Sequence, residues 1–325
     1  MTTGRELQDW LADRPRQRRT KRAIDDFARD WSRGPVHRRF DEAIAALPAQ
    51  TAEAVAHAVR ALFADDGWVE TLLDRLAERL RRDPFFEPPF RTINSDIHGG
   101  LLVFEDERVS IAAGVTRVAQ LAVKKNAKRG ATSIGFTGQV AVLKFVRAGG
   151  ARISFWEAPE ITADFSAATA GQCRRTGERA LVDGEILVVD GRRQSYVIER
   201  ARSNLVLLQA AITLDQAPVT VEYDSASRAY VGCSANGDSA SRIQIITTLL
   251  RKLDRDGAFP AIAAFLDHSD FFVRWHVMKE LLGIDAAAAL PHLKRMAARD
   301  PHPDTRRAAR SVLDRLDSAG PRKAA

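Results

Sequence analysis

Apolar residues are spaced differently in three parts of the chain. Up to residue 82 they recur three and four positions apart, as on one face of a helix, whereas residues 100–232 hold short apolar runs separated by turn residues. From residue 238 the helical spacing returns. The pattern predicts an α+β, multidomain chain with an N-terminal helical region at 1–83, an antiparallel β domain at 84–235, C-terminal helical repeats at 236–316 and a disordered tail at 317–325.

The N-terminal region holds several amphipathic stripes. Ile24, Phe27 and Trp31 share one helical face, and Thr51 is the expected N-cap of a later helix. Other stripes comprise Leu7, Trp10 and Leu11, and then Val69, Leu72, Leu73, Leu76 and Leu80. Because such faces must be buried, the helices form a small bundle or pack on the next domain. The segment "DPFFEPP" at 83–89 breaks the helical pattern with its prolines, so we expect a domain boundary there.

The middle of the chain predicts strands joined by tight turns. Asp106-Glu107, Ala148-Gly149-Gly150, Asp183-Gly184 and Asp190-Gly191 each separate two apolar runs, and glycine supplies the positive φ angles that hairpin turns need. With no long helix between the runs, an antiparallel sandwich or roll is expected. The stretch "RVAQLAVKKNAKRG" at 117–130 fits either a strand or a helix.

An internal repeat occupies the C-terminal region. Residues 259–282 align with residues 290–313 at a spacing of 31 to 32 positions, so that Arg274 falls on Arg306 and Leu281 on Leu313. Each unit reads as a helix, a short turn containing Asp or Pro, and a second helix. A period of this length is typical of stacked helical pairs.

The repeat resembles HEAT or armadillo-type repeats over about 256–316. The likeness rests on the proline near the first helix, on the Asp/Pro turn, and on Arg274 and Arg306 at the start of each second helix. It implies a surface that binds another protein or a peptide. The whole chain also resembles bacterial HEAT-repeat proteins, a likeness that adds no mechanism. The β region loosely resembles a cupin-type roll, on its number of strands and the run "GERALVDGEILVVDGRRQSYVIE", which implies a jelly roll.

Charged residues at the repeat turns have two interpretations. In "DPHPDTRRAAR" (300–310), Pro303 suits the first turn of a helix, Asp304 faces its positive end, and Arg306 reaches a carboxylate or carbonyl of the neighbouring turn. We favour this structural interpretation over a groove for acidic ligands. If a partner binds here, the predicted contact residues are Arg274, His276, Arg306 and Arg307.

The positive charge of the chain is local. Residues 14–39 carry ten Lys or Arg and three Asp, a surplus of seven that equals the net charge of +7 of the whole chain. A nucleic-acid interface would use the positions Arg16, Arg18, Arg19, Lys21 and Arg22. We favour a solvated face of an amphipathic helix instead, because no nucleic-acid-binding motif accompanies the charge.

Catalytic signatures are weak. A metal-binding cupin needs clustered histidines, and residues 99–267 hold none, so we expect no metal and no cofactor. In "NSDIHGG" (94–100), alternation on a strand would place His98 as a base beside Asp96. We favour the alternative that these residues form a polar loop before the first strand. Glu157 in "FWEAPE" is a third candidate, for acid/base work, but we favour a solvated position at the rim of the β domain.

The sequence therefore favours a non-catalytic interaction or scaffold protein, in which the β domain has room for a ligand or peptide. The alternatives are an enzyme on a cupin-like roll and a nucleic-acid binder. No apolar run of about 18 residues predicts a membrane span. Two cysteines without a paired motif predict free thiols, and with no secretory leader we expect a cytoplasmic protein.

Overall fold

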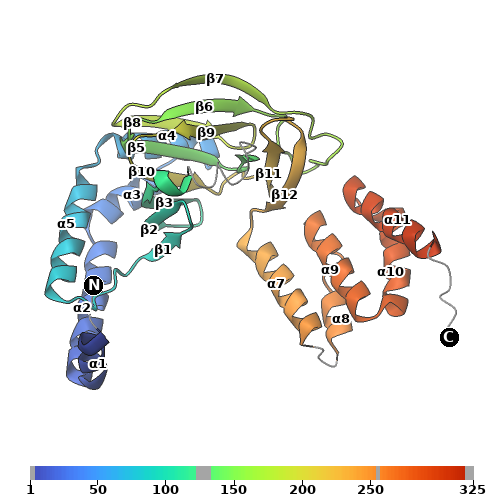
Figure 1. The fold of residues 1–325 in the computed structure, drawn as a ribbon, viewed down its shortest axis with the longest axis horizontal. Coiled ribbons are helices and arrows are strands. Elements are labelled where there is room, and N and C mark those ends of the chain that lie inside the picture. Colours follow the sequence, from blue (N-terminus) through green and yellow to red (C-terminus); the bar gives the residue numbers. More distant parts are fainter. Residues whose placement is uncertain (1–3, 122–132, 254–256, 319–325) are drawn as a thin grey trace. The chain divides into compact units, whose positions relative to one another are not determined.

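The computed structural model describes residues 4–121, 133–253 and 257–318. The chain forms two compact units, each built from segments that are distant in the sequence (Figure 1). Unit 1 comprises Met1–Thr132, Gln139–Trp156 and Arg175–Gln216, and unit 2 comprises Ser133–Gly138, Glu157–Arg174 and Ala217–Ala325. The predicted α+β class, with helices, then antiparallel strands, then helices, is confirmed. The domain boundaries near 83 and 235 stay a prediction.

Unit 1 begins with a series of helices, namely α1 (Gly4–Ala12), α2 (Arg14–Ser32), α3 (Pro35–Ala45), α4 (Ala52–Ala64) and α5 (Gly67–Arg82). Side chains cap the first turns of α2 and α4. Asp13 accepts a hydrogen bond from the backbone N–H of Arg16 at 2.8 Å, which caps α2. Thr51 caps α4 in the same way through the N–H of Ala54 at 3.2 Å, so the predicted N-cap is confirmed.

The strands of unit 1 form two sheets. The larger has the order β1-β2-β3-β10-β5-β8, and the smaller has the order β7-β6-β9. The bounds in the larger sheet are β1 (Arg91–Asn94), β2 (His98–Glu105), β3 (Val109–Thr116), β5 (Val140–Arg147), β8 (Glu185–Asp190) and β10 (Leu205–Ile212). Those in the smaller sheet are β6 (Arg152–Glu157), β7 (Arg174–Ala180) and β9 (Gln194–Arg200). Neighbours in the larger sheet pair antiparallel.

Three predicted hairpin turns are corners between the two sheets. The turn at 148–150 leads from β5 in the larger sheet to β6 in the smaller, and the turns at 183–184 and 190–191 also change sheet. Gly149 and Gly150 have φ angles of +61° and +63°, so the positive-φ requirement is met. The predicted pairing was wrong because a positive-φ turn fixes the chain reversal but leaves open which sheet receives the next strand. Only the turn at 106–107 forms its predicted hairpin, between β2 and β3.

The helices of unit 1 pack on the larger sheet, which was the second of the two predicted arrangements. One core contains Phe40 and Val59 from the helices together with Ile111 and Val142 from the strands. Trp31 fixes this packing, because its indole N–H donates to the carbonyl oxygen of Val103 at 2.8 Å. Side chains at the edges of the predicted stripes stay exposed, namely Leu7, Leu11, Leu73 and Leu80.

Lys144 joins strand β5 to the end of α4. Its side chain is buried, and Nζ donates to the carbonyl oxygens of Phe63 at 2.7 Å and Ala64 at 3.3 Å. The carboxylate of Asp66 lies 3.0 Å from the same nitrogen. Lys144 therefore satisfies carbonyl groups that the last turn of a helix leaves without intrahelical partners.

A second core fills the space between the two sheets of unit 1. It contains Leu143 and Phe145 of β5, Ile153 of β6 and Leu205 of β10. These residues alternate along their strands with outward-facing positions, as expected for stacked sheets. Apolar side chains therefore pack between the two sheets of unit 1.

Unit 2 combines a small sheet with a stack of helices. The sheet has the order β12-β11-β4, with bounds β4 (Ser133–Phe136), β11 (Val219–Asp224) and β12 (Tyr230–Ala235). The helices are α7 (Asp238–Lys252), α8 (Ala258–Ala263), α9 (Phe271–Ile284), α10 (Ala286–Arg299) and α11 (Pro303–Ser318), which lie next to one another in Figure 1. The pairs α8–α9 and α10–α11 correspond to the two predicted repeat units.

Two further sequence predictions concern residues at the margins of the described chain. Most of the undecided stretch at 117–130 and most of the predicted tail at 317–325 lie outside the described residues, although residues 317 and 318 belong to α11. None of the helices within the described ranges is both long and apolar enough to cross a membrane.

Candidate interaction surface of the helical repeats

Arg274 joins the two repeat units from within. The residue is only 5% exposed, and its Nη1 donates to the carbonyl oxygens of His268 and Ser269, both at 2.8 Å. Its Nε and Nη2 donate to the two carboxylate oxygens of Asp300, again at 2.8 Å each. One guanidinium group therefore closes its own turn and binds the turn of the next repeat, a bidentate geometry that suits arginine.

Arg306 repeats the first half of this arrangement. Its Nη1 donates to the carbonyl oxygens of Asp300 at 2.5 Å and Pro301 at 2.9 Å, which lie six and five residues earlier. Arg274 contacts carbonyls at the same two offsets. The equivalence of the two arginines is thus confirmed by geometry, as is the predicted contact of Arg306 with carbonyl groups of the neighbouring turn.

His302 and Asp304 connect the same turn to the loop at 157–174. His302 Nε2 donates to the carbonyl oxygen of Phe165 at 2.9 Å, and its ring stacks on Phe271 with centroids 3.7 Å apart. Asp304 accepts a hydrogen bond from the N–H of Ala167 at 2.8 Å. The polar residues of "DPHPD" therefore form contacts inside unit 2, which supports the structural interpretation of that stretch.

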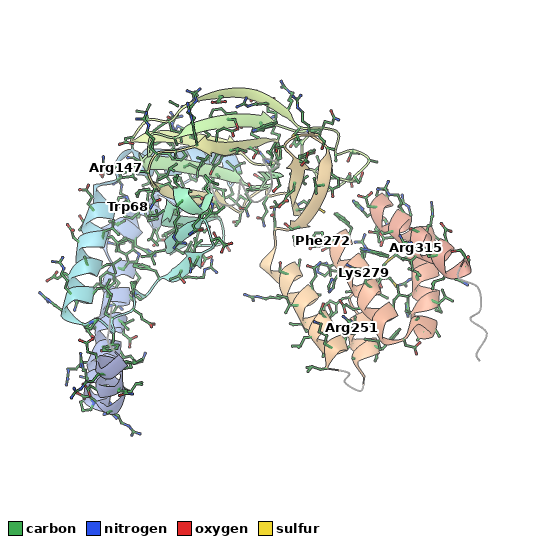
Figure 2. All side chains as sticks on the ribbon, viewed as in Figure 1. Trp68, Arg147, Arg251, Phe272, Lys279 and Arg315 are labelled. Atoms are coloured by element: carbon green, nitrogen blue, oxygen red, sulfur yellow. The ribbon has the colours of Figure 1, made fainter. Side chains whose placement is uncertain are left out.

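His276 lies between α7 and α9 in a hydrogen-bond network. Its Nε2 is 3.0 Å from both the carbonyl oxygen of Gln244 and the hydroxyl of Thr248. Thr248 donates to Glu280 at 2.9 Å, and Arg251, labelled in Figure 2, pairs with the same carboxylate. Burial lowers the pKa of His276. Burial opposes ionisation of Glu280, yet the hydrogen bonds from Arg251 and Thr248 lower its pKa.

The lowered pKa of His276 predicts that acid destabilises unit 2. Below the ordinary histidine value of 6.5, the unfolded chain binds a proton at this site that the folded unit binds only at lower pH. The free energy of unfolding should therefore fall as pH drops from 6.5 through the folded-state pKa. Urea titrations at pH 5 and pH 7 measure this change, and in His276→Gln the contribution of this site should vanish. An equal pH dependence in both proteins would refute the assignment.

An apolar surface adjoins His276 on the outer side of α7. Ile245 is 67% exposed and Leu249 is 51% exposed. A hollow of about 430 Å³ lies there, lined by Ser241, Gln244, Ile245, Thr248, Leu249, Lys252 and His276. We call these seven residues the α7–α9 surface. On the opposite side of α7, Thr247, Ile243 and Leu250 face the core of unit 2.

The predicted partner-binding residues thus occupy different positions. His276 lines the α7–α9 surface, and Arg307 is exposed on α11, where it pairs with Asp304. Arg274 is buried and Arg306 is half-buried in the turn contacts described above. A partner-binding role for any of the four stays a prediction.

Comparison with known proteins identifies the repeat. Residues 233–314 match a family model described as HEAT repeats. The match supports the resemblance seen at Arg274 and Arg306 and extends it to include α7. Arg242 of α7 lies 32 residues before Arg274, which lies 32 residues before Arg306. Arg242 is exposed, unlike Arg274 and Arg306, so the 32-residue spacing alone does not give it their role.

The comparison with curated proteins found no match. Among solved structures, an ectoine synthase from P. lautus is 15% identical, covering 38% of this chain and 69% of its own, with a TM-score of 0.23. A cupin domain from Bordetella pertussis is 12% identical, covering 37% and 98%, with a TM-score of 0.23. A hydroquinone 1,2-dioxygenase from Sphingomonas is 10% identical, covering 35% and 64%, with a TM-score of 0.25. At such scores these likenesses carry no argument about this chain.

Asp96 and His98 lie at a turn and not along one strand. Ser95 N–H donates to the carbonyl oxygen of His98 at 2.8 Å, so the chain reverses between β1 and β2. The alternation that would place Asp96 and His98 on one strand face is therefore absent, because a tight turn rotates consecutive side chains differently. His98 Nδ1 instead lies 3.1 Å from the hydroxyl of Thr116.

Glu157 belongs to unit 2, where it pairs with Arg174, whereas Asp96 and His98 belong to unit 1. The three catalytic candidates therefore form no common site within either unit. Over residues 4–121, 133–253 and 257–318, no group of three or more His, Cys, Asp and Glu side chains is arranged to hold a metal ion.

The basic residues of α2 lie on its solvent side. Arg18, Arg19, Lys21 and Arg22 are exposed, while Thr20, Phe27 and Trp31 form the buried side of the helix. Arg16 lies over the ring of Phe85 at 5.5 Å, and Lys21 pairs with Asp25 at 3.4 Å. This arrangement is the one expected of an amphipathic helix.

We expect these arginines to give no specific nucleic-acid binding. The measurement is filter binding of random DNA and RNA at low and moderate salt, with Arg18→Glu/Arg22→Glu as the comparison. Phosphate contacts would make affinity fall steeply with salt. A saturable affinity that falls steeply with salt and is lost in the double variant would contradict this expectation.

Proposed function

We propose that the chain is a non-catalytic scaffold that holds a protein partner on the α7–α9 surface. The observation that carries the proposal is the exposure of Ile245 and Leu249 beside the hollow at His276, on helices that match HEAT repeats. Proteins with such repeats mostly hold partners, and clustered exposed apolar side chains commonly mark an interaction site.

The surface has the composition of a small interface. Ile245 and Leu249 provide apolar contact area, while Gln244, Lys252 and His276 surround it with polar groups. The neighbouring Thr248–Glu280–Arg251 network holds α7 against α9, so the apolar residues are presented on a rigid base. Arg274 and Arg306 act as positioning residues that set the spacing of the repeats.

Loss of the apolar contacts tests the proposal. The full chain, immobilised, would be incubated with lysate of the cells that naturally produce it, and the recovered partner identified by mass spectrometry and purified. We expect Ile245→Asp/Leu249→Asp to bind that partner at least about tenfold more weakly, a loss of about 1.4 kcal/mol. Leu316→Asp, an exposed apolar position on α11, is the matched control. Equal affinity of the double variant and the wild type would refute the proposal.

Metal analysis addresses the enzyme alternative. The apolar core between the sheets of unit 1 favours a structural role there, and a ligand-binding role for the β domain stays a prediction. Iron, manganese or zinc bound in freshly purified protein would favour an enzyme instead.

We also propose a cytoplasmic location, since Cys173 and Cys233 are both free thiols.

A further inference from the structure

A second concave site lies on the turn side of the HEAT repeats. It is a groove of about 420 Å³ between the α8–α9 turn and the second half of α10. Its lining residues are Leu266, Asp267, His268, Ser269, Arg274, His292, Arg295, Met296, Arg299, Asp300 and Pro301. The spacing of His292, Arg295, Met296 and Arg299 places them on one face of α10. We call this site the turn groove.

The floor of the turn groove is apolar and fixed. Leu266 and Met296 belong to the buried core of unit 2, and Pro301 continues the apolar lining at the turn. Arg274 and Asp300 also reach the groove, but their charges neutralise each other in the bidentate pair. The floor therefore offers an apolar side chain a preformed apolar contact.

The rim of the turn groove is cationic. Arg295 faces the carboxylate of Asp267 at 3.4 Å, a pair in which the carboxylate is largely exposed. Arg299 has no hydrogen-bond or ion-pair partner among the residues that the structure describes, and it lies in the last turn of α10. His268 and His292 add two imidazoles. Arg299 is thus the uncompensated charge that an incoming anion would meet.

We infer that the turn groove binds a peptide segment of a protein partner in which an apolar side chain stands next to Asp or Glu. The apolar side chain lies against Leu266 and Met296, and the carboxylate accepts hydrogen bonds from the guanidinium group of Arg299. A carboxylate and a guanidinium group can form two parallel N–H···O hydrogen bonds in one plane. The carboxylate of Asp267 on the same rim disfavours the repeated phosphates of a nucleic acid. The inference rests on the proposed function, because it names the chemistry of a partner segment for the same repeats.

The test is selection from a phage-displayed library of random twelve-residue peptides on the full chain. Peptides enriched on the wild type should pair an apolar residue with an adjacent Asp or Glu. The best peptide, labelled with fluorescein, is then titrated by anisotropy. Arg299→Glu should weaken binding of the peptide at least about tenfold and Arg299→Gln by less, because glutamate repels the peptide carboxylate whereas glutamine keeps a neutral donor. Arg315→Glu, with the same change in net charge on α11, should bind like the wild type.

The outcomes separate this inference from the proposed function. Enriched peptides that bind Arg299→Glu as tightly as the wild type, yet fail to bind Ile245→Asp/Leu249→Asp, would overturn the inference about the turn groove. That result would leave the proposed function of the α7–α9 surface intact. A selection that enriches basic peptides, purely apolar peptides or no peptide would also overturn the inference. This holds whatever affinity Ile245→Asp/Leu249→Asp has for the protein partner. Arg299→Gln should keep the wild-type melting temperature in a thermal melt, because Arg299 has no side-chain partner to lose in the described chain. Arg299→Glu should lower it only slightly, because a negative charge then lies in the last turn of α10.

Discussion

Replacing Arg274 with Ala should destabilise unit 2 by about 3–5 kcal/mol, the usual cost of breaking a buried ion pair by removing one partner. The substitution leaves the carboxylate of Asp300 buried without its cation and leaves the carbonyl oxygens of His268 and Ser269 without a donor. Hydrogen exchange of peptides from α9 to α11, measured over a urea series, reports the change in the stability of unit 2.

Arg306 is the matched control for this prediction. It makes the same two carbonyl contacts, but the described chain gives it no carboxylate partner, and it is only half-buried. Arg306→Ala should therefore cost only about 1–2 kcal/mol, the range of ordinary hydrogen bonds. Equal losses for the two variants would show that the pair with Asp300 adds nothing to the stability of the stack.

The second large effect is expected at Lys144 in unit 1. Lys144→Ala should lower the free energy of unfolding of that unit by about 2–4 kcal/mol, because each unsatisfied buried acceptor costs roughly 1–3 kcal/mol. The carbonyl oxygens of Phe63 and Ala64 lose their donor, and Asp66 loses its cation.

Hydrogen exchange of peptides from α4 and β5, measured over a urea series, locates the effect of Lys144→Ala. Lys21→Ala, in an exposed ion pair with Asp25, is the control and should change stability by less than about 1 kcal/mol. Unchanged protection of α4 in Lys144→Ala would mean that water replaces the ammonium group at no cost.

The helical repeats were predictable from the sequence because their contacts are local and periodic. Arg274 and Arg306 contact carbonyls within six residues of themselves, so the motif that aligns them also fixes their role. The cap at Thr51 was predictable for the same reason, since a side chain that accepts an N–H three residues later needs no knowledge of the fold.

Features set by distant parts of the chain were not predictable. Glycine at 149 and 150 indicates a turn, but the sheet that receives the next strand is decided by packing across the core. The exposure of Leu249 depends on which side of α7 meets α9. The pairing of Lys144 with α4 joins residues about eighty positions apart, and no local pattern marks a lysine for burial.

The central claim is that the arginines of the HEAT turns hold the repeats together, and neither bind the partner of the α7–α9 surface nor perform a reaction. A double-mutant cycle of Arg274→Met and Asp300→Leu tests it most directly. If the claim holds, the losses in the two single variants sum to clearly more than the loss in the double variant, which leaves no buried charge unpaired, and the double variant still binds that partner. Additive losses in the cycle, or a stable double variant that no longer binds the partner, would contradict it.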